Sequence, residues 1–399
     1  MEKRSWQAVL VVVCVVVLIF VPNFAQYQLS PISFRIMDEF GMNAVQFSAL
    51  FSAAMITGMV VSPVAGLLCD KFGARMTIGI GALITLAALV IRVFAQDYLT
   101  VFLCMVFAGV TATFLNSNMP KIMGNWFSGK NVGIAVGVGI SGSTLSMAVG
   151  MSTAMLFSST RSMFAFTAVV AAVATALWWV GFRESPKDAS SSPKRDEPKP
   201  PPLLECLKAA VKSRNIWIIG LGLAMNMAAV MSIMTFMPQA LVSVRGLDEG
   251  AAGAITSIVT IGNLVGSIAI PIIVARFRDS RKALAAASVL AGAGTAFAWQ
   301  LPDGAVMYAA LFLTGCCVSG IMPALLSFVV QLPEIGQKYA GSAGGVAASM
   351  QLAGAVIVPT YILTPLFGGN FIAFYAAAGA LCLVMAACCL LLPKFGENE

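Results

Sequence analysis

Long apolar segments separated by short polar stretches make up most of this chain. Residues 44–68 contain no charged side chain, and neither do residues 76–91. A helix of ~20 apolar residues crosses the hydrocarbon core of a bilayer, so each segment with its flanks is long enough to span a membrane. The charged turn between them, Asp70 to Arg75, is too short for an extramembrane domain. We therefore predict two antiparallel spanning helices joined at this turn.

The same pattern recurs along the chain and divides it into two halves of six apolar segments each. The predicted spans cover residues 6–30, 44–69, 76–95, 99–122, 132–157 and 162–182, then 216–244, 251–274, 283–301, 306–330, 341–366 and 371–392. Between the halves the chain is rich in Ser, Pro and charge, and its prolines forbid a helix near residues 198–202. The sequence predicts an N-terminal six-helix bundle (1–182), a cytoplasmic linker (183–214) and a C-terminal six-helix bundle with a tail (215–399).

Composition supports an all-α polytopic membrane protein with twelve transmembrane helices in two pseudo-symmetric bundles. Hydrophobic residues make up 59% of the chain, charged residues 10%, and the mean hydropathy is +0.90. A soluble domain has about 25% charged residues. We therefore expect a chain embedded in a lipid bilayer.

The net charge of +7 reflects how cations are distributed among the loops and predicts no nucleic-acid partner. Counting alternate loops as cytoplasmic places 20 of the 24 Lys and Arg residues on one side and 4 on the other. By the positive-inside rule, both termini are then cytoplasmic. We expect a multi-pass protein of the plasma membrane, the inner membrane in a bacterium, and a monomer.

The chain has few residues that could bind a metal or act as an acid or base within the membrane. It contains no His, and its nine Cys lie in or beside spans or near the cytoplasmic face. The adjacent pairs Cys316–Cys317 and Cys388–Cys389 are a poor arrangement for a metal. None of the 17 acidic residues falls inside a predicted span. We expect no metal, no cofactor and no enzymatic activity.

The turn after the second span resembles a known signature. Gly66-x-x-x-Asp70-Lys71-x-Gly73-x-Arg75 is similar to the loop between the second and third spans of the major facilitator superfamily. The resemblance implies the major facilitator fold and an Asp that docks on the other half to latch one conformation. The predicted latch comprises Gly66, Asp70, Gly73 and Arg75, with Asp279, Arg281 and Lys282 in the corresponding loop of the second half. Gly73 suits a sharp turn because glycine readily adopts positive φ.

Matched spacing in the two halves indicates an internal repeat. Lys130, Gly133 and Gly137 open the fifth span, and Lys338, Gly341 and Gly345 open the eleventh with identical spacing. Two six-span halves in one orientation are typical of a transporter that binds its substrate near the midplane, between the repeats.

Three cations lie near the ends of predicted spans, namely Arg35, Arg92 and Lys121. Long basic side chains near helix ends usually extend to the interface, and we expect this for all three. Lys121 is still the best candidate for attracting an anion, because it follows Asn116-Ser117-Asn118 on a helix that lines the cavity in the resembled family. That family also has an Arg four residues before a Gly in this span, whereas here Met105 precedes Gly109.

Amide and hydroxyl side chains at mid-span depth are the candidate substrate ligands. A rise of ~1.5 Å per residue places the middle of a ~30 Å core about ten residues from either face. Such groups cost free energy in lipid unless paired, so the alternative is hydrogen bonding between helices. The predicted substrate-binding residues are Gln26, Tyr27, Asn116, Lys121, Ser143, Asn226, Asn263 and Gln351.

A weaker resemblance indicates the substrate. Residues 126–137 are similar to the connection between spans 4 and 5 of the oxalate/formate and monocarboxylate branch. Asn118-x-Pro120 and the Gly-rich start of span 11 also look like nitrate- and cyanate-type porters. We expect a secondary transporter that moves a small, monocarboxylate-like organic anion by alternating access, with a proton as a candidate co-substrate. The alternatives are an exporter of small apolar or aromatic compounds and, in another class, a membrane sensor or enzyme.

Overall fold

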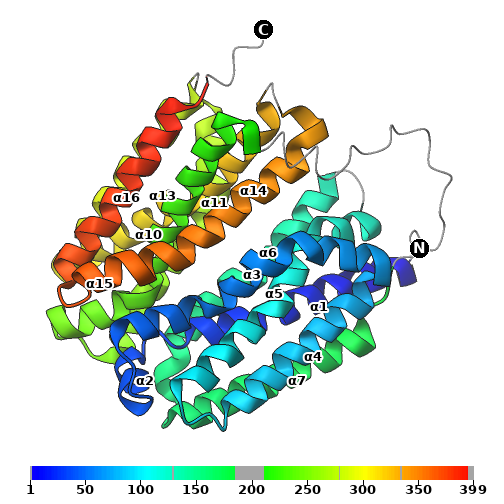
Figure 1. Ribbon diagram of the computed structural model, residues 1–399, viewed down its shortest axis with the longest axis horizontal. Helices are drawn as coiled ribbons and strands as arrows, with labels where there is room; N and C mark the ends of the chain where they lie inside the picture. Colours follow the sequence, from blue (N-terminus) through cyan, green and yellow to red (C-terminus); the bar gives the residue numbers. More distant parts are fainter. Residues whose placement is uncertain (1, 128–129, 185–210, 278, 333–334, 394–399) are drawn as a thin grey trace. The chain divides into compact units, whose positions relative to one another are not determined.

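A computed structural model describes residues 2–127, 130–184, 211–277, 279–332 and 335–393. Every regular element in these ranges is a helix, and twelve helices are long and apolar enough to cross a membrane (Figure 1). The predicted fold class is confirmed. The predicted linker, 183–214, lies mostly outside the described residues.

The helices of the first half follow one another with short connections. They are α1 (Glu2–Tyr27), α2 (Ser33–Glu39), α3 (Ala44–Phe72), α4 (Ala74–Arg92), α5 (Tyr98–Trp126), α6 (Lys130–Thr153), the 3-10 turn η1 (Ala154–Leu156) and α7 (Thr160–Gly181). The short helix α2 fills the predicted connection between spans 1 and 2.

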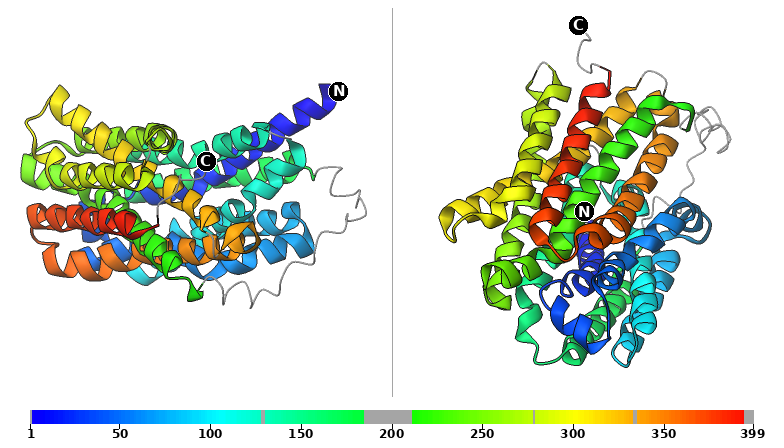
Figure 2. Two further views of the ribbon diagram at one scale, coloured as in Figure 1. Left: turned by 90° about the horizontal axis from the view of Figure 1, so that it is seen from above. Right: turned by 60° about the vertical axis from the view of Figure 1, so that its left-hand side comes forward.

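The second half repeats this order. It comprises α10 (Arg214–Arg245), α11 (Glu249–Ala275), α12 (Ser280–Phe297), η2 (Ala298–Gln300), α13 (Ala305–Gln331), α14 (Gly336–Ile357), the π-helical segment η3 (Val358–Leu363), α15 (Thr364–Phe367) and α16 (Phe371–Leu391). Figure 2 shows the long helices of this half running alongside one another.

The chain divides into two compact units. The first comprises Met1–Met42 and Ala53–Pro198, and the second comprises Asn43–Ser52 and Lys199–Glu399. The first turns of α3 therefore group with the second unit, where the hydroxyls of Ser48 and Thr360 lie 3.0 Å apart. The bundle boundaries drawn from the sequence stay a prediction.

Glycines allow α11 and α13 to pack backbone against backbone in the second unit. A Cβ at Gly262 or Gly266 would collide with the main chain of Phe312 or Cys316. Likewise, a Cβ at Gly315 or Gly320 of α13 would collide with atoms of α11. Small residues at such interfaces let membrane helices approach closely and gain van der Waals contact. We call these four residues the glycine seam.

Candidate functional site

Two of the predicted substrate ligands in the second unit lie around one helix junction. The amide nitrogen of Asn226 on α10 donates to the carbonyl of Val318 on α13, at 2.7 Å. That of Gln351 on α14 lies 3.2 Å from the sulfur of Met322 and 3.9 Å from that of Met227. Met227 directly follows Asn226 on α10, and Met322 lies one turn beyond Val318 on α13. Both amides therefore lie where α10, α13 and α14 meet. Thioether sulfur is a weak acceptor, so the Gln351 amide keeps most of its hydrogen-bonding capacity.

Asn263 is the third candidate of this unit and lies on α11. Its side chain is buried, and its Oδ1 has no hydrogen-bond partner in the described part of the chain. The structure joins it to neither Asn226 nor Gln351 by a hydrogen bond.

Three candidates of the first unit involve helix α1 and its neighbour α6. Gln26 and Tyr27 are both buried at the end of α1, and Nε2 of Gln26 has no partner among the described residues. Ser143 on α6 accepts a hydrogen bond from Asn23 of α1, at 3.3 Å. This bond matches the alternative expected for mid-span polar groups, a hydrogen bond between helices.

The other two candidates of this unit, Asn116 and Lys121, lie on an exposed face of α5. Asn116, Ser117 and Lys121 are all exposed, whereas Asn118 is buried and donates to the carbonyl of Phe114. Residues four apart share a helix face, so Ser117 and Lys121 point the same way. The hydroxyl of Ser117 also lies 3.4 Å from that of Ser62 on α3. We call Ser62, Asn116, Ser117 and Lys121 the polar face of the first unit.

The prediction that Arg92 extends to the interface is wrong. Its side chain is fully buried at the end of α4, where Nη1 donates to the carbonyl of Ala25, at 3.1 Å. Nη1 also lies 3.0 Å from the sulfur of Met105, and the guanidinium carbon lies 4.1 Å from the centre of the Phe164 ring. Packing against α1, α5 and α7 holds the charge inside the bundle. The sequence did offer a signal for this residue, because a cation within a membrane span is by default a candidate functional residue. Arg35 is only half-buried, and it donates to the carbonyl of Phe157.

The predicted latch of the first half is built on a glycine-dependent turn. Gly73 has φ of 82° and ψ of 153°, and it caps the start of α4. Two residues later, Arg75 donates to the carbonyl of Trp179 at the end of α7, at 2.7 Å. Trp178 returns a bond from its indole nitrogen to the carbonyl of Arg75. Gly66 and Asp70 lie within α3, and the surroundings of Gly66 and of the Asp70 side chain are outside what the structure describes.

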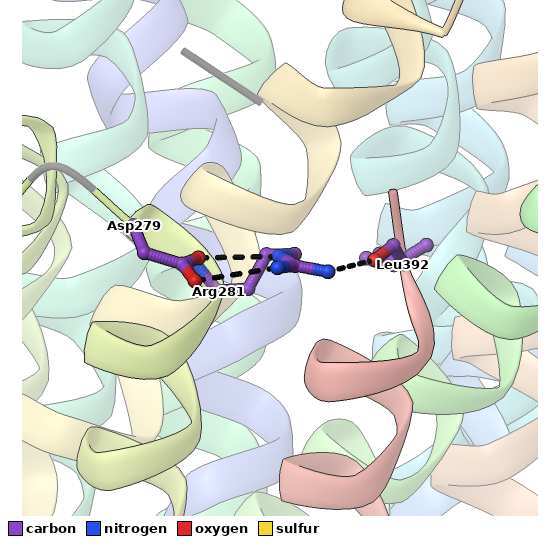
Figure 3. A network of polar contacts seen from close by, with 3 residues as sticks. All are labelled: Asp279, Arg281 and Leu392. Atoms are coloured by element: carbon purple, nitrogen blue, oxygen red, sulfur yellow. Dashed lines mark hydrogen bonds and ion pairs between the residues drawn. The ribbon is translucent and has the colours of Figure 1, made fainter. Parts of the chain in front are cut away.

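The corresponding turn of the second half shares the bond from an arginine to a helix-end carbonyl but begins with Asp279 in place of a glycine (Figure 3). Asp279 caps α12 and pairs with Arg281, with Nε 3.1 Å and Nη2 3.2 Å from its carboxylate oxygens. Arg281 also donates to the carbonyl of Leu392 at the end of α16, at 2.6 Å. Hydrogen bonding to Arg281 holds the pKa of Asp279 below its usual range. Lys282 is exposed. Each of these bonds lies within one unit, so a latch between the halves stays a prediction.

The described residues contain no group of three or more His, Cys, Asp or Glu side chains that could hold a metal ion.

Comparisons with known proteins agree with this architecture of twelve spans in two units. The family model of the Major Facilitator Superfamily matches residues 12–359. The chain therefore belongs to this superfamily and is a multi-pass membrane transporter. It is 25% identical over 334 residues to the uncharacterized MFS-type transporters MT3072 and Rv2994 of two Mycobacterium tuberculosis strains, covering 82% of this chain and 71% of each relative.

Solved structures show the same fold at low sequence identity. A bacterial homolog of the human lysosomal transporter Spinster, in an inward-facing and unoccupied conformation, superposes with a TM-score of 0.73 at 14% identity, covering 97% of this chain and 94% of that one. The nucleoside transporter NupG, in a mutant form, gives a TM-score of 0.76 at 14% identity, with 95% and 99% covered.

Proposed function

We propose that this transporter moves a small, monocarboxylate-like organic anion by alternating access. The observation that carries the proposal is the polar face of the first unit, where the cation of Lys121 lies one helical turn from the hydroxyl of Ser117. An anion can be attracted by the ammonium and held by neighbouring hydroxyl and amide groups. Within the second unit, the amides of Asn226 and Gln351 are separate, neutral candidate ligands.

Burial costs favour a substrate pathway along the polar face. Asn116 and Ser117 are exposed although they lie within the apolar span Tyr98–Met119. An amide or hydroxyl facing hydrocarbon without a partner costs several kcal/mol. This face therefore turns toward water, substrate or other protein groups in the membrane.

The distribution of acidic side chains limits how a proton could be co-transported. No Asp or Glu lies in the interior of the twelve spans among the described residues. A co-transported proton would then travel on the carboxylate of the substrate itself. Following the positive-inside count, we place both termini in the cytoplasm and the protein in the inner membrane of a bacterium.

Counterflow in proteoliposomes tests this function. Vesicles are loaded in turn with lactate, pyruvate, oxalate, formate, nitrate or cyanate, and uptake of the matching label is followed at two pH values. We expect saturable counterflow for one anion. Lys121→Gln should raise its KM roughly tenfold, as expected for losing about 1.4 kcal/mol of attraction. Lys212→Gln, which removes an exposed cation just before α10, should leave KM unchanged.

Failure of every anion would reject the small-anion proposal. Uridine and a small aromatic compound complete the panel, because NupG is a nucleoside transporter and an exporter of apolar or aromatic compounds is the other candidate. Counterflow restricted to either of these would assign the substrate class accordingly. An unchanged KM in Lys121→Gln would remove Lys121 from the site.

A further inference from the structure

A cavity of about 260 Å³ lies in the first unit, at the ends of helices α2, α4 and α7 away from the Gly73 turn. Its lining includes Glu39, Arg92, Gln96, Thr160, Arg161 and Phe164. None of these belongs to the predicted substrate ligands or to the latch. A water molecule takes about 30 Å³ in the liquid, so the cavity has room for a small organic anion.

Arg92 is one of the lining residues, and its guanidinium is only partly paired. Nη1 is engaged by Ala25 and Met105, and the ring of Phe164 covers one face. Nε and Nη2 are buried and have no hydrogen-bond partner among the described residues. These two nitrogens form the side of the guanidinium that binds a carboxylate through two parallel hydrogen bonds.

Helix α7 adds donors and positive potential to the same cavity. Thr160, its first residue, is buried, and its hydroxyl has no partner in the described ranges. Ser159 caps this 22-residue helix by accepting from the N–H of Ser162, and the helix start carries partial positive charge from the macrodipole. Arg161 is exposed at the cavity, with its guanidinium 5.5 Å from the ring of Phe94.

We propose that this cavity is a carboxylate-binding site, with the ligand held by Nε and Nη2 of Arg92 and by the hydroxyl of Thr160. A buried arginine without a counter-ion is costly, because the attraction of a partner must repay its desolvation. The charged lining, Arg92, Arg161 and Glu39, has a net charge of +1 and suits a monoanion. The planar two-oxygen shape of a carboxylate fits the free guanidinium edge.

Two carboxylates could occupy the site. One is a small monocarboxylate from solution, which we expect. The other is Glu39 of α2, which is exposed, lines the cavity and makes no ion pair within the described part of the chain. The experiment therefore includes Glu39→Gln, which removes the internal competitor and keeps the shape of the side chain.

The test measures ligand-dependent thermal stability of the purified full-length protein in detergent. Acetate and lactate are titrated at constant ionic strength against chloride, because a ligand that binds the folded state raises the unfolding midpoint in a saturable manner. We expect a saturable shift in the wild type. Arg92→Met should weaken the apparent affinity at least tenfold, and Arg92→Lys should not restore it, because an ammonium lacks the paired donors.

Further variants separate this site from the substrate site and from misfolding. Thr160→Val keeps the shape of the side chain and should weaken binding severalfold. The titration is repeated in Lys121→Gln, in which the proposed substrate site is weakened, and the shift that is lost in Arg92→Met should persist there. A saturable shift only in Glu39→Gln would support the site with Glu39 as its resident carboxylate. No saturable shift in either the wild type or Glu39→Gln, or an equal affinity in Arg92→Met, would overturn the proposal.

Discussion

Arginines Arg92 and Arg281 show how surroundings decide the role of one side chain. Each guanidinium nitrogen of Arg281 donates a bond, two to Asp279 and one to the carbonyl of Leu392. Arg92 is buried against Phe164 with part of its guanidinium unpaired. The first arrangement stabilises a helix end, whereas the second is costly without a ligand. Satisfied hydrogen bonds thus mark Arg281 as structural, and unsatisfied ones mark Arg92 as a candidate binding residue.

Arg281→Met should destabilise the second unit. The substitution removes the bond that ties the start of α12 to the end of α16, and a net loss of about 1 kcal/mol is expected for such a bond. The thermal unfolding midpoint in detergent should fall accordingly. Lys282→Met changes the exposed neighbour and should leave the midpoint unchanged. Equal midpoints for the wild type and Arg281→Met would contradict this role.

The stabilising effect of the pair should also depend on pH. Because Arg281 lowers the pKa of Asp279 in the folded state, the carboxylate stabilises the fold above its ordinary pKa of about 4. This contribution is lost as pH falls through the lowered folded pKa. The difference in midpoint between the wild type and Arg281→Met should therefore be constant from about pH 8 to 5 and shrink below about pH 4.

The helices were predictable from the sequence because a membrane span needs a long apolar run. The polar turns and the Gly73 conformation followed from the same pattern. Side-chain directions did not, because a long Arg can point to the interface or into the bundle with the same neighbours in sequence. Arg92 was misplaced for this reason, and the contacts of Gln351 with Met227 and Met322 depend on tertiary packing.

The close packing of helices was only partly visible in the sequence. Glycines at the starts of α6 and α14 drew attention through their matched spacing, yet a Cβ at Gly137 or Gly345 would meet nothing within 4 Å. The tight interface is the glycine seam, which includes Gly262-x-x-x-Gly266, a small-residue spacing typical of contacts between membrane helices. Glycine spacing that is matched between the two halves therefore indicates the internal repeat, and it does not identify the glycines at which helices pack closely.

Gly266→Ala should destabilise the second unit, because the added methyl group would collide with the backbone of Cys316. Overpacking of this kind costs roughly 1–3 kcal/mol. Gly345→Ala is the matched control, since the same substitution there meets no neighbour and gains helix propensity worth up to about 1 kcal/mol. Thermal midpoints in detergent should therefore move in opposite directions. A Gly266→Ala midpoint at or above that of the wild type would show that the seam can relax.

The repeat of the whole molecule is visible in matched bonds as well as in matched spans. In the first unit, Arg75 at the start of α4 bonds the carbonyl of Trp179 at the end of α7. In the second, Arg281 at the start of α12 bonds the carbonyl of Leu392 at the end of α16. Each unit therefore ties its third and sixth spans together at the same end. Bracing of this kind favours movement of each unit as a rigid body, which the proposed alternating access requires.

The predicted latch concerns the two halves of the molecule together. An Asp that stabilises one conformation of the two halves alters the populations of states, and only to the extent of its differential contacts. Asp70→Asn and Asp279→Asn should therefore slow counterflow, roughly tenfold for each 1.4 kcal/mol of lost stabilisation. Substrate should still protect both variants against thermal unfolding, because the substrate ligands are intact.

Asp97→Asn is the control for these variants. Asp97 caps α5 through Thr100, and Asn caps a helix as well as Asp does, so its counterflow rate should equal that of the wild type. An unchanged rate in Asp70→Asn would contradict the latch. A slow Asp279→Asn with a normal Asp70→Asn would instead trace the effect to the bracing of α12 against α16, since Asp279 pairs with the arginine that holds Leu392.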